Sequence, residues 1–363
     1  MTSPGHTERL VLPGVITADQ AAETVRGITA IQRPDGAIPW FTGGHLDPWD
    51  HVEAAMALDA AGEHQRATDA YRWLARHQNP DGSWYAAYSY ADGVHGTPTT
   101  RRRETNFCAY IAVGIWHHYL STGDDAFLDE MWPHLLAAIE FVLELQLPGG
   151  EIAWKRDEDG SHPHEALLTG CCSVYQALRC ALAVAEQCEE PQPDWELAAG
   201  QLRHAILRHP ERFLEKSRYS MDWYYPVLGT VLRGPEAKER IESGWNRFVV
   251  PGLGVRCVDD HPWVTGGESA ELALALWAMG ESDRAVEILA SIRHLRAEDG
   301  MYWTGYVFRD DAVWPEERTS WTAAALLLAV AALGGDEATT AVFDGGRLPL
   351  GLIEPPGLEC SCG

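Results

Sequence analysis

The sequence is poor in basic residues. Lysine and arginine together number 28 against 53 aspartates and glutamates, so the formal net charge of the 363-residue chain is -25. A chain this acidic repels the phosphates of nucleic acids and the anionic surfaces of membranes. We therefore expect no nucleic acid and no membrane as a partner, and a substrate that is neutral or cationic.

Targeting segments and nucleotide-binding motifs are missing as well. No charged and then apolar leader opens the chain, and no apolar run approaches the roughly 18 residues of a membrane span. These features predict a cytoplasmic protein, in which the eight cysteines stay reduced. The chain has no P-loop, no dinucleotide-binding glycine fingerprint and no G-x-S-x-G elbow, so we expect no cofactor.

Residues that could bind a metal occur only in incomplete patterns. His162 and His164 lack a second pair at zinc spacing, and the acidic stretch 157–160 lacks the ligand spacing of a calcium loop. Cys360 and Cys362 form a C-x-C near the end of the chain, which we interpret as a free tail. The sequence therefore predicts no metal site.

What the chain does have is helical periodicity over most of its length. Nearly apolar segments alternate with amphipathic, more charged ones; the first kind of helix is buried, and the second kind covers it. The predicted helices span 17–32, 48–61, 64–78, 103–121, 125–146, 165–187, 193–208, 220–233, 235–247, 267–280, 282–297 and 318–334. Six inner and six outer helices in alternation predict an all-α fold, an (α/α)6 toroid.

An internal repeat marks the turns after several outer helices. Residues 32–36 and 78–82 both read Q-x-P-D-G, and each turn is followed by a tryptophan. Weaker copies occur at 146–154 and 296–303. No linker is visible. We therefore predict one domain over 1–363, with 1–16 and 344–363 as irregular tails and short hairpins in the loops 84–100 and 149–157.

Acidic residues stand at the start of nearly every predicted inner helix. In such a toroid these ends meet at one mouth, formed here by 47–53, 104–107, 165–169, 222–225, 263–268 and 314–321. Each acid taken alone has a structural explanation, because carboxylates cap helices and favour the positive end of the helix dipole. Asp47 in particular is suited to cap the helix that begins at Pro48, with Asp50 three residues further on.

The neighbours of these acids are not typical of caps. Aromatic rings, amides and hydroxyls accompany them, and the chain contains 15 tryptophans in all. A carbohydrate cleft needs such a set, because aromatic rings stack on sugars and two carboxylates act as acid and base across a glycosidic bond. The residues predicted to contact a sugar are His45, Trp49, Glu104, Asn106, Glu165, Asp222, Trp223, Tyr224, Trp263, Glu317 and Trp321.

The Q-x-P-D-G turns followed by tryptophan resemble the QW repeats of squalene–hopene cyclases and related prenyltransferase toroids. The acidic signatures of those families are absent. The segments 257–260 and 308–311 lack the leading acid of D-x-D-D, and 124–128 lacks the last acid of D-D-x-x-D. This resemblance therefore implies an architecture only.

A second resemblance runs through most of the chain. Asp47 to Asp50, Glu104 to Asn106, Trp132-Pro133, 167–171 and 267–274 resemble six-hairpin glycosidases of the glucoamylase type. Taken whole, the sequence is most similar to the methylmannose polysaccharide hydrolases of actinobacteria. That resemblance implies a cytosolic α-endomannanase acting on 1,4-linked, partly methylated mannan. It also implies that the family's acid residues correspond to Asp47, Asp50 and Glu268.

The first hypothesis is therefore an inverting glycoside hydrolase acting on an oligo- or polysaccharide. Repulsion between Asp47 and Asp50 raises one pKa of the pair, which favours Asp50 as the acid, Glu268 as the base and Asp47 as a sugar ligand. An inverting enzyme needs about 6.5–9.5 Å between its two carboxyl groups, leaving room for a water. Two alternatives stay open, namely a terpenoid cyclase or prenyltransferase and a non-catalytic carbohydrate-binding toroid. The exact sugar, endo or exo action and the oligomeric state also stay open.

Overall fold

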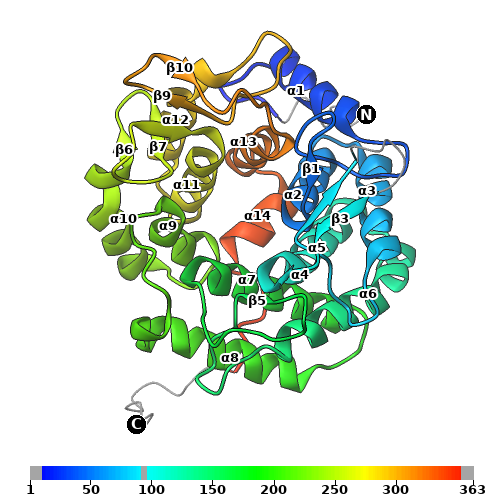
Figure 1. The fold of residues 1–363 in the computed structure, drawn as a ribbon. Helices are drawn as coiled ribbons and strands as arrows, with labels where there is room; N and C mark the ends of the chain where they lie inside the picture. Colours follow the sequence, from blue (N-terminus) through cyan, green and yellow to red (C-terminus); the bar gives the residue numbers. More distant parts are fainter. Residues whose placement is uncertain (1–9, 91–95, 353–363) are drawn as a thin grey trace.

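The computed structural model describes residues 10–90 and 96–352, and its helices form two concentric rings (Figure 1). The inner ring contains α2 (Pro48–Ala60), α4 (Thr105–Ala109) with α5 (Ile111–Thr122), α7 (Leu168–Gln187), α9 (Ser220–Leu228), α11 (Gly266–Ala278) and α13 (Ser320–Leu333). Each inner helix contacts the next, and α13 returns to α2, which closes the ring. The predicted (α/α)6 toroid is confirmed.

The outer ring covers the inner one helix by helix. It contains α1 (Ala18–Ile31), α3 (His64–His77), α6 (Asp125–Leu143), α8 (Pro193–Arg208), α10 (Gly234–Phe248) and α12 (Ser282–Ser291). Burial follows the sequence pattern, since every residue of α2 is buried whereas α3 buries only one apolar face. The hydrophobic effect therefore assigns the nearly apolar helices to the inside.

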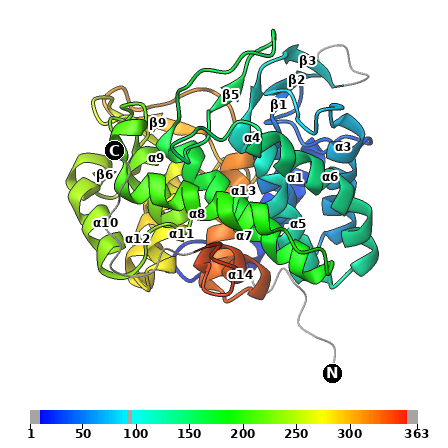
Figure 2. The same ribbon diagram turned by 90° about the horizontal axis from the view of Figure 1, so that it is seen from below.

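The predicted helices 220–233 and 282–297 end earlier, at Leu228 and Ser291, and two larger differences concern a break and an additional helix. The predicted helix 103–121 is interrupted at Tyr110, which separates α4 from α5. A further helix, α14 (Glu337–Asp344), lies where none was predicted and begins at the side-chain cap of Asp336. It buries Ala338, Val342 and Phe343 against α5, α11 and α13. In Figure 2 it closes the end of the ring opposite the strands.

One helix among the described residues, α7, is long and apolar enough to cross a membrane by length and composition. No apolar run of this length was expected from the sequence. In the structure 89% of its apolar window is buried inside the protein. The hydropathy of α7 is therefore accounted for by its place in the inner ring.

Short strands line the opposite end, where the inner helices begin (Figure 2). They are β1 (His45–Leu46), β2 (Ala87–Ser89), β3 (Thr97–Thr100), β4 (Arg103–Glu104), β5 (Lys155–Arg156), β6 (Val249–Val250), β7 (Gly254–Arg256), β8 (Trp263–Thr265), β9 (Gly305–Val307) and β10 (Ala312–Val313). They pair into the sheets β1-β2-β3, β4-β5 and β10-β9-β8-β7-β6. The hairpin expected in 84–100 is present as β2 and β3, and a single antiparallel bridge joins Gln146 to Ile152 where the second was expected.

The repeated turns connect neighbouring outer helices. The side-chain amide of Gln78 donates to the carbonyl of Gly82 at 2.9 Å, which closes its own turn, and to the carbonyl of His134 on α6 at 2.8 Å. Gln32 makes the same two bonds to its own turn and to α3, and Gln146 makes them to its own turn and to α8. The repeat that resembles cyclases therefore encodes the assembly of the outer ring.

The last glycine of each turn sits directly on the next outer helix. Gly82 has φ +83°, and a Cβ at this position would collide with the backbone carbonyl of Ala137 in α6. Gly36 has φ +92° and packs in the same way on Asp69 of α3. Only glycine fits here, because both the left-handed conformation and the close backbone approach exclude a side chain.

We expect Gly82→Ala to destabilise the protein more than Gly123→Ala. Gly123 ends α5 with φ +65°, and a Cβ added there would meet no atom within 4 Å. Its substitution therefore costs only the strain of a left-handed backbone conformation, about 1 kcal/mol. At Gly82 the collision adds about 1–3 kcal/mol of overpacking. Denaturant midpoints of the two variants measure the difference, and equal midpoints would contradict this account of the repeat.

Candidate active site

Five acidic side chains converge at the mouth of the ring. Asp47, Asp50 and Glu53 lie at three-residue spacing along the start of α2, and Glu268 and Glu271 lie at the same spacing on α11. This spacing places the acids of each helix on one face. All five are at most 5% exposed, and α2 and α11 flank the same helix, α13. We call these five residues the acidic cluster.

Asp47 is held by two hydrogen bonds. Its Oδ1 accepts the backbone N–H of Asp50 at 2.9 Å, which makes it the N-cap of α2, and its Oδ2 accepts the indole N–H of Trp40 at 2.7 Å. Burial raises the pKa of Asp47, and these two bonds partly oppose that rise. The carboxyl group is thus fixed in position at the start of the helix, as the sequence predicted for a cap.

Asp50 has the environment of a carboxylic acid that keeps its proton. Burial raises its pKa well above the usual range, and the negative charges of Asp47 and Glu53 raise it further. No lysine or arginine forms an ion pair with Asp50 in the described residues. A carboxyl group in this situation is protonated at pH values where an exposed aspartate is ionised.

Glu53 and Glu271 form the deeper part of the cluster. The hydroxyl of Tyr110 donates to Glu53 at 2.9 Å, and burial raises the pKa of Glu53 to about 7. The hydroxyls of Tyr224 and Tyr225 both donate to Glu271, the latter at 2.9 Å, and burial raises its pKa well above the usual range. The charge of Glu53 acts on Glu271 in the same direction. Burial therefore favours the protonated form of both carboxyl groups.

Glu268 follows two glycines in the first turn of α11. A Cβ at Gly267 would collide with the ring of Trp321, so this glycine lets α11 pack closely on α13. One carboxyl oxygen of Glu268, Oε2, is buried and has no hydrogen-bond partner in the described residues. The thiol of Cys257 lies beside Glu268, whose charge adds to the effect of burial in raising the pKa of the thiol. Glu268 thus offers a free acceptor oxygen at the cluster.

Aromatic rings enclose the cluster. Trp49 lies 5.4 Å from Tyr110 and 6.0 Å from Tyr225, measured between ring centroids, in edge-to-face arrangements. Trp40 lies 4.3 Å from His45. The indole N–H of Trp49 is buried without a partner in the described residues. These rings surround the carboxyl groups with apolar surface and so lower the polarity of their environment.

Several other predicted residues surround the cluster. Glu104 is paired with Arg102 at 2.7 Å, and its pKa is raised first by burial and further by the charge of Asp47. Asp222 accepts the hydroxyl of Thr169 at 2.8 Å, and burial raises its pKa. Asn106 is half-buried next to the start of α7, and Trp263 packs edge to face on Trp314 at 5.1 Å. Glu165 is exposed, and Glu317 is half-buried in the loop before α13.

Two predicted sugar contacts have a different place in the structure. Trp223 donates to the backbone carbonyl of Arg240 at 2.9 Å and stacks on Phe248 at 5.2 Å, so it belongs to the packing between α9 and α10. Tyr224 is fully buried and holds Glu271. Trp223 and Tyr224 were predicted as sugar contacts because they adjoin Asp222 in the sequence. Successive residues of a helix point in different directions, however.

The structure also adds residues that the sequence analysis did not select. Glu271 is itself a member of the cluster, and Trp40, Tyr110 and Tyr225 donate hydrogen bonds to members of the cluster. Glu271 carried a usable signal, because it follows Glu268 at the same spacing that relates Asp47 to Asp50. The tyrosines and Trp40 carried none, since their contacts join segments distant in sequence.

No group of three or more metal-ligating side chains is arranged to hold an ion in residues 10–90 and 96–352. The rings of His162 and His164 lie 5.7 Å apart without a third ligand. Cys360 and Cys362 lie outside the described residues.

Known proteins provide an independent comparison. No protein-family model matches the chain. The chain is 53% identical over 351 residues to MMP endo-(1,4)-3-O-methyl-alpha-D-mannosidase of Mycolicibacterium hassiacum, which covers 97% of this chain and 96% of that protein.

Solved structures share the fold at low sequence identity. A glycosidase variant in complex with glucose superposes with a TM-score of 0.71 at 15% identity, over 92% of this chain and 99% of that one. The GH63 mannosylglycerate hydrolase of Thermus thermophilus superposes with a TM-score of 0.64 at 14% identity, over 85% of this chain and 99% of that one. A D-mannose isomerase also superposes, with a TM-score of 0.67 at 11% identity, over 87% of this chain and 96% of that one. The fold alone therefore does not define the reaction.

The extent of the match to the mannosidase does identify the family. Its 53% identity spans nearly the whole of both chains. This chain therefore belongs to the family of that endo-mannosidase and is a glycoside hydrolase built on an (α/α)6 toroid.

Proposed function

We propose that this protein cleaves internal 1,4 linkages of an α-mannan that carries 3-O-methyl groups, the methylmannose polysaccharide, with inversion at the anomeric carbon. The relative's name supports the choice of substrate and the endo action. The observation that carries the mechanism is that one buried acidic cluster contains both Asp50, whose pKa is raised by burial and neighbouring acids, and Glu268, whose Oε2 has no hydrogen-bond partner in the described residues. The cytoplasmic location and the absence of nucleic acid and membrane partners belong to the same proposal.

In the proposed reaction Asp50 donates its proton to the glycosidic oxygen as the bond to the anomeric carbon breaks. Glu268 accepts a proton from a water that attacks this carbon from the opposite face, so the new C–O bond has inverted configuration. Asp50 is left ionised and Glu268 protonated, and exchange with water resets both. Asp47, fixed by Trp40 and by the start of α2, binds a hydroxyl of the sugar at the cleavage site.

The deeper acids keep Asp50 in its reactive form. Glu53 lies one helical turn after Asp50, and Glu271 contributes its charge from the facing helix α11. Ionisation of Asp50 would add a negative charge to the buried acidic cluster, with which no lysine or arginine of the described residues forms an ion pair. Glu53 and Glu271 are thus positioning residues that act on the proton of Asp50 without reaching the substrate.

The two alternatives are less well supported. The cyclase-like repeat is accounted for by its contacts between outer helices, and the acidic signatures of prenyl chemistry are absent. A non-catalytic toroid would have no use for a buried carboxylic acid with a raised pKa in the same cluster as a carboxyl oxygen that has no hydrogen-bond partner in the described residues. Turnover of the polysaccharide by the purified protein distinguishes it from a binding protein directly.

Substitution of the two catalytic carboxyls should separate their roles. With the polysaccharide, Asp50→Asn and Glu268→Ala should each lower kcat by about 10²–10⁴-fold, as expected for loss of a general acid or base. With an activated α-glycosyl fluoride, Asp50→Asn should keep activity because fluoride leaves without a proton. Glu268→Ala should then require azide and give the inverted glycosyl azide, which NMR of the product measures.

Glu337→Gln, an exposed substitution on α14 at the far end of the ring, is the control and should leave both rates unchanged. The reverse pattern with fluoride and azide would exchange the two roles. Full activity in both site variants would remove this site from the reaction.

The pH dependence of the rate should report the proton of Asp50. Because its pKa is raised, the acid form should persist through neutral pH, and kcat/KM on the polysaccharide should fall only as pH rises past that value. The alkaline fall should disappear with the glycosyl fluoride as substrate, since no acid is then needed. An identical alkaline fall with both substrates would show that another group titrates.

The free energy of unfolding should also decline as pH rises through the range in which the buried acids ionise. The folded-state pKa of Glu53 is about 7 against an unfolded value of 4.5, so its contribution is complete below pH 4.5 and is lost as pH rises through 7. Each such group changes the free energy of unfolding by up to about 1.4 kcal/mol per pH unit. Glu53→Gln should therefore flatten the dependence of the unfolding midpoint on pH between 5 and 8.

The matched control is Asp159→Asn. Asp159 is fully exposed and its pKa is lowered by hydrogen bonds from Ser161, so it does not titrate in that range. A pH slope that is equally steep in the wild type and in Glu53→Gln would contradict the proton assigned to Glu53.

A further inference from the structure

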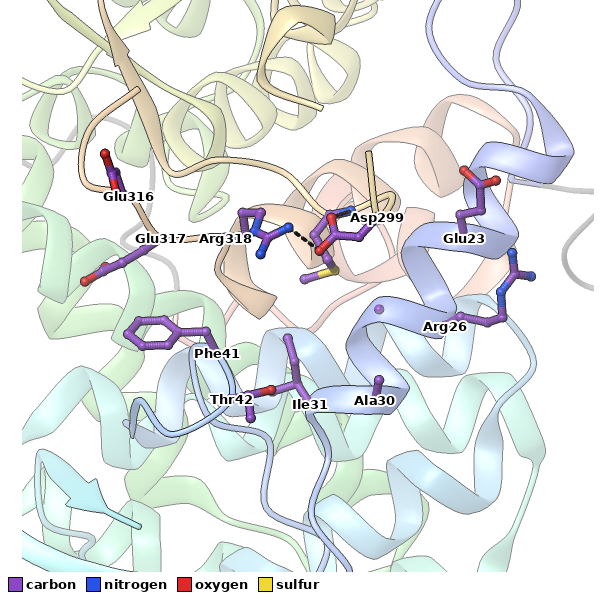
Figure 3. Close-up of a pocket in the computed structure, with 12 residues that line it drawn as sticks. Glu23, Arg26, Ala30, Ile31, Phe41, Thr42, Asp299, Glu316, Glu317 and Arg318 are labelled. Atoms are coloured by element: carbon purple, nitrogen blue, oxygen red, sulfur yellow. Dashed lines mark hydrogen bonds and ion pairs between the residues drawn. The ribbon is translucent and has the colours of Figure 1, made fainter. Parts of the chain in front are cut away.

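A cavity whose lining is separate from the acidic cluster lies between α1 and the loops that lead into α2 and α13. It has a volume of about 500 Å³ and is bounded by α1, the 41–42 loop, the turn at 299–301 and the 316–318 loop (Figure 3). This volume falls within the range of about 300–1,000 Å³ that is typical of small-molecule sites. None of the residues that line it belongs to the acidic cluster.

Two walls of this cavity are continuous with the active site. Phe41 and Thr42 directly follow Trp40, which binds Asp47. The 316–318 wall leads into α13, and the backbone N–H of Ser320 donates to the carbonyl of Trp40 at 2.6 Å. A polymer bound at the cluster therefore needs only to pass over these two joined loops to reach the cavity.

The lining combines apolar surface with acids. Ala30, Ile31, Phe41 and Met301 provide the apolar part, and Figure 3 shows Ala30 and Ile31 on α1 and Phe41 on the neighbouring loop. Four acids and two arginines also line it, and Arg318 is already paired with Asp299 and lies over Trp303 at 5.0 Å. The excess of acids disfavours an anionic ligand such as a phosphate.

A methylated sugar matches both parts of this lining. It is neutral, its hydroxyls donate to carboxylates, and its methyl ether cannot donate a hydrogen bond but gains from apolar contact. Burial of one methyl group favours binding by about fourfold. An unmethylated sugar would leave the apolar wall in contact with a hydroxyl.

We propose that this cavity is a distal subsite that binds a 3-O-methylated sugar unit of the polysaccharide, away from the bond that is cleaved. The proposal rests on the proposed function of the neighbouring cluster. It assigns to the 41–42 loop, the 316–318 loop and the C-terminal half of α1 a role in selecting long, methylated chains.

Filling the cavity tests the proposal. Ala30 is exposed and lines the cavity, so Ala30→Phe should occupy it, whereas Ala18→Phe places the same ring at an exposed position of α1 outside the lining. With the methylated polysaccharide, Ala30→Phe should raise KM about tenfold with kcat unchanged, because it removes binding made equally in the ground and transition states. With an oligosaccharide too short to reach from the cluster to the cavity, KM and kcat should not change. Ala18→Phe should match the wild type on both substrates.

A second variant tests the preference for methyl groups. Ile31→Gln keeps the approximate size of the side chain and makes the wall polar, so the ratio of kcat/KM for methylated over plain α-1,4-mannan should fall about fourfold. Thermal midpoints confirm that each variant is folded.

The outcomes distinguish this inference from the function on which it rests. If the wild type does not hydrolyse the polysaccharide, the proposed function itself fails. If it does, but Ala30→Phe leaves KM unchanged or affects long and short substrates equally, the distal subsite is overturned. If the ratio of methylated to plain substrate is unchanged in Ile31→Gln, the assignment of the ligand as a methylated sugar is overturned.

Discussion

The burial of five carboxyl groups without a lysine or arginine partner among the described residues is the constraint on which the site depends. An ionised carboxylate in such a place is costly, and no lysine or arginine in the described residues forms an ion pair with the acidic cluster. The fold accommodates the cluster by placing Asp50 and Glu268 in first helical turns and by directing the hydroxyls of three tyrosines at the deeper acids. Protons retained on these carboxyl groups lower the negative charge of the cluster. The same burial that raises the pKa of Asp50 favours the protonated form that the proposed mechanism requires.

The outer ring provides the rigidity that this arrangement needs. The inner helices are buried on nearly all sides, so they cannot relax around a misplaced acid. Around them, the glutamine of each turn fixes the spacing between one outer helix and the next by hydrogen bonds to the backbone. Because these bonds use backbone carbonyls, neighbouring outer helices can vary in sequence while their separation stays fixed.

Much of the fold could be predicted from the sequence because its main signal is local. The alternation of apolar and amphipathic segments gave both rings, and most helix bounds agree within a few residues. The helix α14 was missed because it is short and its apolar face is completed only by α5, α11 and α13. The break at Tyr110 was missed for a similar reason, since apolar periodicity continues across it and the turn depends on tertiary packing.

The site could be predicted only in part. Asp47, Asp50 and Glu268 were found from their positions at helix starts and from a family resemblance, and the structure places all three in the acidic cluster. Trp223 shows why adjacency is a weaker guide, because the residue next to Asp222 points to the outer ring. The bond from Trp40 to Asp47 spans only seven residues, yet it depends on the shape of the loop between them, which no periodicity describes.

The position of α14 has a topological consequence. By packing on α5, α11 and α13 it stops the far end of the ring, so the toroid is a cup and not a tunnel. A long polymer cannot thread through such a cup as it could through an open ring. It has to bind across the open end of the ring with one segment inserted toward the acidic cluster, and both product fragments then leave through the same end.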